Sequence, residues 1–219
     1  MELIKTQNGY LTILTGKTDM GKSTITVYDC SEQIKAGKSV LFFSFEYCQC
    51  IIYNKLITHF GLKWQDLFKL NVIDASNLNL QNVIETIKAK KGQVDTVYID
   101  YLDLLRNATY PGSNDDVNML NQIQTICREL AKVAKELEIT IVLLSQVGSE
   151  STFEQTVDRL NAFTDKINEK NHNVIKMFIG KGNVIDSRIN YDDIVHIILV
   201  EGYNLKHFSS INIKEVYKD

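Results

Sequence analysis

Residues 10–24 read YLTILTGKTDMGKST, and within them Gly16 to Ser23 (GKTDMGKS) match the pattern G-x-x-x-x-G-K-[ST]. The segment before the motif, Tyr10 to Leu14, is apolar and β-prone, which favours a strand. The segment after it, Ser23 to Ala36, carries apolar residues at helical spacing. A strand, a glycine-containing loop and a helix in this order are the setting of a phosphate-binding P-loop, so this stretch predicts an α/β fold with a nucleotide site.

The residue types of the motif suit phosphate chemistry. Gly16 and Gly21 lack a Cβ, so the backbone can curve around a phosphate and aim its N–H groups inward at a helix N-terminus. We expect Lys22 to reach the β- and γ-phosphates and the Ser23 hydroxyl to ligate Mg²⁺. The predicted nucleotide-binding residues are Gly16, Lys17, Thr18, Asp19, Met20, Gly21, Lys22, Ser23 and Thr24. The alternative is a strand-to-helix turn with an incidental Lys-Ser pair, but motif and flanks agree.

Length and composition indicate one globular domain over residues 1–219. The chain has 24 Lys and Arg against 27 Asp and Glu, which argues against a basic nucleic-acid coat but leaves room for a local basic loop. We see no signal peptide and no apolar run of membrane-spanning length. The four cysteines, Cys30, Cys48, Cys50 and Cys127, show no zinc pattern. We therefore expect a soluble, cytoplasmic protein with reduced cysteines and no membrane partner.

Three buried-strand patterns end at polar residues. Continuous apolar runs at 39–45, 96–100 and 140–144 are typical of parallel strands, and Glu46, Asp100 and Gln146 lie at their carboxyl ends. These ends face the crevice in which open α/β sheets bind ligands. Asp100 fits a Walker B carboxylate that holds Mg²⁺ opposite Ser23. Glu46 is a general base or a helix-start carboxylate, and Gln146 is a γ-phosphate sensor or a polar strand end, about equally on the residues alone.

Other segments carry weaker patterns. The spacing predicts a helix over 47–60 with an apolar face of Cys50, Ile51, Leu56 and Ile57, a loop over 106–114 around the single proline, and a final strand over 211–217. Residues 147–190 are less legible. Within them Lys181 and Arg188 lie on predicted loops, where they contact nucleic acid or belong to a solvated hairpin, and the sequence leaves both options open.

Several motifs occur in one order: the P-loop, SVLFFSFE, VYIDYLDLLR, ICRELAKVAKELEITIVLLSQ and DD before IVHIILV. In this order they resemble the ATPase domain of DnaB-type replicative helicases, a RecA-like class, well over 8–146 and weakly over 185–219. The resemblance implies a RecA-like P-loop core with a mainly parallel central sheet flanked by helices. It also implies ATP and Mg²⁺ as cofactors, single-stranded DNA and a replication protein as partners, and a hexameric ring. It makes Glu46 the catalytic base, with Lys22 and Gln146 as the other catalytic residues.

The chain also departs from this family. The P-loop begins by residue 16, so we find no counterpart of the family's helical N-terminal domain. No arginine follows Arg188, so the trans-acting arginine finger has no clear match, and only Lys214 and Lys218 lie near its place. A lysine is a point charge and cannot make the bidentate contact of an arginine.

The sequence leaves two candidate functions open. The first is an ATP-dependent DNA helicase core, of phage or mobile-element type. The alternative is a RecA-like ATP-binding accessory protein that acts on a helicase without unwinding DNA. A recombinase or circadian-clock relative is less favoured, because the contexts of Tyr101-Leu102 and Ser145-Gln146 resemble helicases.

Overall fold

One eight-stranded sheet organises the part of the chain that the structure describes. This structure is a computed structural model that describes residues 3–112, 116–148, 151–168, 173–181, 194–201 and 204–212. The strand order is β3-β2-β4-β5-β1-β6-β7-β8. The strands are β1 (Leu11–Lys17), β2 (Val40–Ser44), β3 (Leu70–Asp74), β4 (Thr96–Asp100), β5 (Thr140–Val147), β6 (Val174–Lys181), β7 (Ile194–Glu201) and β8 (Asn204–Asn212). The pairs from β3 to β6 are parallel and those from β6 to β8 antiparallel, which confirms the mainly parallel sheet.

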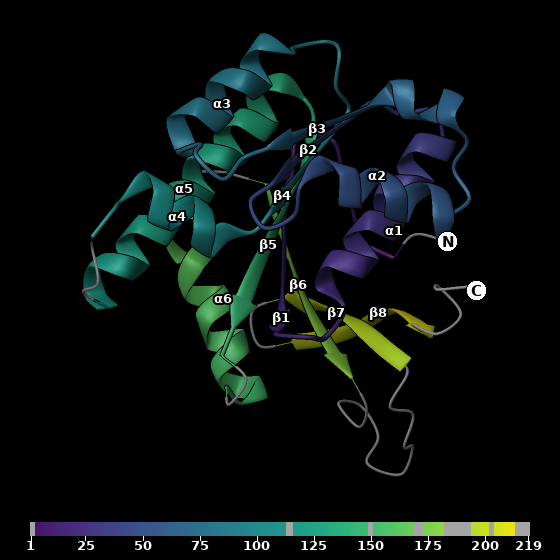
Figure 1. The fold of residues 1–219 in the computed structure, drawn as a ribbon. Coiled ribbons are helices and arrows are strands. Elements are labelled where there is room, and N and C mark those ends of the chain that lie inside the picture. Colours follow the sequence, from purple (N-terminus) through teal and green to yellow (C-terminus); the bar gives the residue numbers. More distant parts are fainter. Residues whose placement is uncertain are drawn as a thin grey trace.

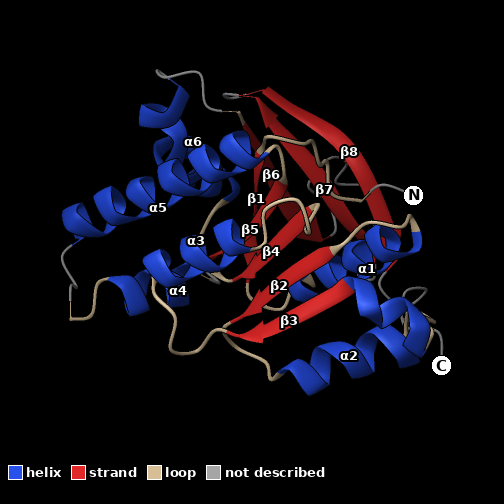
Figure 2. Ribbon diagram, turned by 90° about the horizontal axis from the view of Figure 1, so that it is seen from above, coloured by secondary structure: helices blue, strands red, loops and turns tan. Residues whose placement is uncertain are grey.

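Helices cover both faces of the sheet (Figure 1). They are α1 (Lys22–Lys35), α2 (Gln49–Thr58), the 3-10 helix η1 (Trp64–Lys69), α3 (Leu80–Ala89), α4 (Leu102–Thr109), α5 (Asp116–Leu137) and α6 (Phe153–Asn168). Figure 2 shows α1 and α2 on one face and α3 to α6 on the other. In the described ranges, no helix is long and apolar enough to cross a bilayer.

Both faces of the central strands are buried, and this explains their unbroken apolar sequences. In β5, Ile141 and Leu143 pack with the layer of α3 to α6, whereas Val142 and Leu144 pack with the layer of α1 and α2. Alternate side chains of a strand point to opposite faces. A strand covered on both sides must therefore be apolar at every position, as parallel strands in α/β proteins are.

Two predicted helical details are wrong. On α2 the predicted apolar face is correct for Leu56 and Ile57, which pack in the core, but wrong at its start, where Ile52 is buried and Ile51 is 39% exposed. The predicted loop over 106–114 begins too early, because α4 continues to Thr109. Leu102 and Leu105 are fully buried and anchor that helix. The chain leaves the helix at its C-cap, Tyr110, and turns at the Pro-Gly pair, residues 111–112, where Gly112 takes a φ of 78°.

The last strand begins earlier than predicted. Strand β8 starts at Asn204 and pairs antiparallel with β7, with a register shift between Ile197 and Ile198. It is the last strand in the strand order, so it forms one edge of the described sheet, as predicted for the final strand. Of the predicted strand over 211–217, residues 211–212 belong to β8, and 213–217 lie outside the described residues.

A buried polar contact joins the P-loop helix to the sheet. Tyr98 of β4 is fully buried, and its hydroxyl donates a hydrogen bond of 2.5 Å to Asp29 Oδ2 on α1, which is 2% exposed. The Tyr98 ring also stacks on Phe42, with the ring centroids 5.7 Å apart. Burial together with Asp29 raises the pKa of Tyr98, so the phenol remains a donor. This contact fixes α1 against β4.

We expect Tyr98→Phe to lower the free energy of unfolding by about 1.5–3 kcal/mol, because it removes a hydrogen bond to a buried carboxyl group. Urea unfolding monitored by circular dichroism measures the change. Tyr53→Phe is the matched control: its hydroxyl donates to Leu70 O over 3.3 Å in a partly buried place, so its loss should cost less. Equal losses in the two variants would contradict the anchoring role of Tyr98.

Candidate functional site

The two positions of the P-loop motif that hold glycine favour it for different structural reasons. Gly21 is the N-cap of α1 and takes a left-handed φ of 86°, which favours glycine. Gly16 lies inside β1 between β5 and β6. A Cβ on Gly16 would lie 3.1 Å from Ile179 O, so this glycine permits the close approach of β6. The loop therefore curves at Gly21, while Gly16 packs against the sheet.

Lys22 lies inside the loop. Its Nζ donates hydrogen bonds to Gly16 O at 2.8 Å and Lys17 O at 2.6 Å, and the residue is only 9% exposed. Burial lowers the pKa of Lys22, and the carboxylates of Asp100 and Asp19 oppose that shift. The ammonium group thus occupies the position at which the loop would meet a phosphate, and it faces acidic side chains.

Asp100 is the buried carboxylate of the site. It ends β4 and is 2% exposed. Among the residues that the structure describes, no donor reaches its Oδ2 atom. Burial raises the pKa of Asp100 to about 6, while a hydrogen bond with Ser23 and the charge of Lys22 oppose the rise. A buried, incompletely satisfied carboxylate beside a serine hydroxyl suits a bound cation.

A cleft of about 310 Å³ joins these groups at the carboxyl end of the sheet. Its lining comprises Thr18, Asp19, Gly21, Lys22, Ser23, Thr24, Glu46, Tyr47, Lys55, Asp100, Tyr101 and Gln146. The structure thus brings most of the predicted site residues together, Glu46 and Gln146 included. Of the other predicted residues, Gly16 and Lys17 lie in β1, Met20 packs against the α1 layer, and Lys181 ends β6. Arg188, Lys214 and Lys218 lie outside the described residues.

Gln146 contacts the P-loop directly. Its Nε2 donates a hydrogen bond of 2.7 Å to Thr18 Oγ1, and its backbone N–H lies 3.4 Å from Asp103 Oδ2. Glu46 follows β2, is exposed and also lines the cleft. The cleft therefore contains both a carboxylate open to solvent and an amide close to the loop.

The sequence did not single out Lys55, Tyr47 or Tyr101, all of which line the cleft. Lys55 lies on α2, and its Nζ is 5.0 Å from the centroid of the Tyr47 ring, a cation–π contact. Tyr101 directly follows the Walker B strand, and that position could have indicated it. Lys55 carries no such sequence signal, because only packing shows that α2 points this lysine into the cleft.

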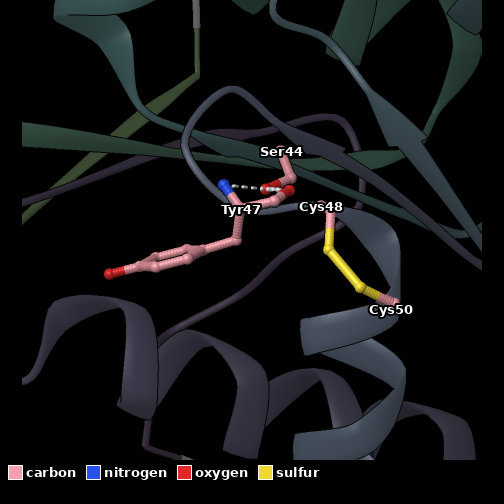
Figure 3. The surroundings of a disulfide bond; sticks show 4 residues. All are labelled: Ser44, Tyr47, Cys48 and Cys50. Atoms are coloured by element: carbon pink, nitrogen blue, oxygen red, sulfur yellow. Dashed lines mark hydrogen bonds between the residues drawn. A yellow bond between two sulfur atoms is a disulfide. The ribbon is translucent and has the colours of Figure 1, made fainter.

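A disulfide lies beside the cleft (Figure 3). Cys48 and Cys50 are joined by it at the start of α2, so the expectation of reduced cysteines is wrong for this pair. Cys30 and Cys127 are free and buried. The Ser44 hydroxyl donates to Tyr47 O at 2.7 Å and accepts from Tyr47 N–H at 3.1 Å, which closes the turn between β2 and α2. That turn carries Glu46.

A larger apolar groove is a different feature. It measures about 800 Å³, lies between α2 and η1 and includes Tyr53, Trp64 and Phe68 in its lining. None of its lining residues is charged, so it lacks the groups that a phosphate needs.

In the described ranges there is no cluster of three His, Cys, Asp or Glu able to hold a metal. Proteins nevertheless often supply only one carboxylate and one hydroxyl as ligands to Mg²⁺, since the ion keeps several waters and phosphates as its other ligands.

Comparison with known proteins gives a consistent family signal. Residues 62–165 match the model of the DnaB-like helicase C terminal domain. The replicative DNA helicase DnaB of Pasteurella multocida is 28% identical over 178 residues, which is 68% of this chain and 37% of that protein. The chain spans little more than a third of the length of the curated relatives that it matches, 36% and 37%.

Solved structures agree on the fold. One solved ATPase domain superposes with a TM-score of 0.69 at 21% identity, covering 97% of this chain and 84% of that one. A DnaB-like replicative helicase, solved in a study of its interactions with primase, gives 0.67 at 19% identity and covers 94% and 55% of the two chains. These matches support the resemblance predicted from the sequence: the chain has the fold of DnaB-like ATPase domains, and residues 62–165 are similar to the DnaB-like helicase C terminal domain.

Proposed function

We propose that this chain is the ATP-hydrolysing motor of a DnaB-type replicative helicase, which moves along single-stranded DNA as a hexameric ring. The observation that carries the proposal is Asp100, a desolvated carboxylate directly under a P-loop with one oxygen free of described donors. A buried charge of this kind is costly unless a cation completes it. The family signal and the RecA-like fold support the same function.

The residues of the cleft fit ATP with Mg²⁺. Lys22 can exchange its two carbonyl contacts for phosphate oxygens, and Gly21 opens the loop at the N-terminus of α1. Ser23 and Asp100 would hold Mg²⁺, which neutralises charge on the β- and γ-phosphates when bound. Of the remaining loop residues of the proposal, Thr18, Asp19 and Thr24 line the same cleft, whereas Lys17 ends β1 and Met20 packs against the α1 layer.

Three side chains would act on the terminal phosphate. Glu46 is exposed and lines the cleft, so it can take a proton from an attacking water. Gln146 is tied to Thr18 of the loop and can donate its amide hydrogens to the γ-phosphate. Lys55 brings a second cation to the cleft from within the same chain. Since electrostatic stabilisation is usually the largest catalytic term, Lys55 can supply part of the charge that an arginine finger supplies elsewhere.

Contacts with DNA and with partners belong to the same proposal. We assign nucleic-acid contact to the region of Lys181 and Arg188, and a contribution in trans to Lys214 or Lys218. Of these residues only Lys181 lies in a described strand, at the end of β6. A primase-like replication partner is proposed from the solved DnaB-like helicase whose interactions with primase were studied.

A second candidate is an accessory ATP-binding protein that acts on another helicase. The residues near the expected place of the arginine finger, Lys214 and Lys218, favour it, because a lysine cannot make the bidentate contact of an arginine. Steady-state ATP hydrolysis with and without single-stranded DNA, combined with the solution mass in ATP and Mg²⁺, separates the two. DNA-stimulated turnover in a hexamer supports the motor, whereas tight binding without turnover in a monomer supports the accessory protein.

Lys22→Ala should lower ATP turnover by on the order of 100-fold or more, because it removes the ammonium that contacts the phosphates. A coupled ATPase assay with single-stranded DNA measures the loss. Lys132→Ala changes an exposed lysine on α5 and should leave turnover unchanged. Intact turnover in Lys22→Ala would refute the assignment of this cleft as the ATP site.

The stability of the chain free of Mg²⁺ and nucleotide should depend on pH through Asp100. Its pKa is raised from 3.8 in the unfolded chain to about 6, so the folded chain binds this proton more tightly. Stability is therefore lost as pH rises from about 4 to about 6, by roughly 3 kcal/mol. Asp100→Asn removes the charge, so at pH 8 this variant should be the more stable protein, with little difference near pH 4.

Urea unfolding across this pH range tests the prediction. Asp158→Asn changes an exposed carboxylate on α6 and should give no such pH-dependent difference. Adding Mg²⁺ with ATP should stabilise the wild type more than Asp100→Asn, since ligand that binds only the folded state adds to its stability. A difference between wild type and Asp100→Asn that is the same at every pH would contradict the assigned pKa.

Lys55→Ala should lower kcat by about 100-fold if Lys55 supplies charge to the transition state. Lys55→Arg keeps the charge and should retain much more activity. Lys91→Ala, an exposed lysine after α3, is the control and should behave as wild type. If Lys55→Ala turns over ATP at the normal rate, then the required cation comes from another residue or another chain.

A further inference from the structure

The backbone of Gln146 points its N–H toward β4. Along β5, Ile141 N–H donates to Tyr10 O on the β1 side at 3.1 Å, whereas Thr140 N–H donates to Asp95 O on the β4 side at 3.0 Å. Successive N–H groups of a strand alternate between its two neighbours. Even-numbered residues of β5 therefore face β4, and Gln146 is the last but one of the strand.

Strand β4 has no backbone acceptor left at that level. It ends at Asp100, its pairing with β5 ends at Ile99 and Leu143, and the chain turns into α4 at Leu102. The Asp103 side chain lies where a further carbonyl of β4 would accept this hydrogen bond, and its Oδ2 atom is 3.4 Å from the Gln146 backbone nitrogen. A carboxylate thus takes the place of the missing strand carbonyl.

The other oxygen of this carboxylate faces α6. Asp103 Oδ1 lies 3.7 Å from Arg159 Nη2, and both side chains are partly buried, at 27% and 32% exposed. The Arg159 guanidinium in turn lies over the Phe163 ring, 5.4 Å from its centroid. Packing on an aromatic ring limits the freedom of the arginine, so the ion pair joins two restrained groups.

These contacts connect the P-loop to α6 through consecutive residue pairs. Thr18 of the P-loop accepts from the Gln146 side chain, the Gln146 backbone donates to Asp103, and Asp103 pairs with Arg159. Gln146 is thereby held at both its amide group and its backbone. The series runs from the phosphate loop to α6 across the layer of α4.

We propose that Asp103 is a positioning residue, which holds Gln146 against the P-loop and, through Arg159, ties that position to α6. The proposal rests on the proposed function, since Gln146 must act on a bound nucleoside triphosphate. The competing explanation is that Asp103 only stabilises the first turn of α4, where carboxylates interact well with the helix dipole. The two explanations differ in whether the effect of Asp103 passes through the Gln146 side chain.

A double-mutant cycle separates them. Asp103→Ala should lower kcat for ATP between about 10- and 100-fold with KM changed less than about twofold, as expected when a supporting contact shifts a catalytic group. In a Gln146→Ala background the same substitution should have no further effect on kcat. Asp103→Asn retains an acceptor oxygen and should keep an intermediate kcat. Asp158→Ala on α6 is the control and should match wild type.

Binding provides a readout that needs no turnover. Calorimetric titration with ADP and with a non-hydrolysable ATP analogue gives the preference for triphosphate over diphosphate. Asp103→Ala should reduce this preference as much as Gln146→Ala does, and the double variant should reduce it no further. If Asp103→Ala does not fold, judged by circular dichroism, the same comparison with Asp103→Asn decides.

The outcomes distinguish this inference from the proposed function. A wild-type chain that binds neither nucleotide overturns the proposed function, and the positioning role with it. A wild type that binds and hydrolyses ATP, with additive losses for Asp103 and Gln146, overturns only the positioning role. Losses that are not additive in both assays support it.

Discussion

The site depends on one electrostatic arrangement, the buried Lys22 ammonium and the buried Asp100 carboxylate in the same cleft. Both groups are desolvated, and burial favours the neutral form of each: it lowers the pKa of Lys22 and raises the pKa of Asp100. Each charge opposes the other's shift, which reduces the cost of placing both in one cleft. The sheet keeps them close, because β1 and β4 both neighbour β5 and end at the same edge.

Much of the fold follows from the sequence because its central strands are covered on both faces. Such strands must be apolar at every position, so their runs stand out, and each ends at the residue that lines the cleft. Asp100 and Gln146 could be placed in this way without coordinates. The same reasoning failed for a helix that buries only one face, because the sequence did not show which residues face the core. Helix α2 buries Ile52 and exposes Ile51, although the two side chains are equally apolar.

What could not be predicted comes from tertiary placement alone. Lys55 is one lysine among several on helices, and only the packing of α2 beside Tyr47 brings its charge to the cleft. Asp103 lies three residues after Asp100, in the first turn of α4, and no sequence pattern connects it with Gln146. Its contact with Gln146 exists because β4 stops before β5 does, and strand ends are determined by three-dimensional pairing.

The contacts in and behind the cleft involve both helical layers. Lys22, Ser23 and Lys55 come from α1 and α2 on one face, while Asp103 and Arg159 belong to α4 and α6 on the other. Gln146 lies between them at the end of β5 and contacts both sets. Gln146 therefore connects the P-loop on one side of the sheet with Asp103 on the other, through its side chain and its backbone.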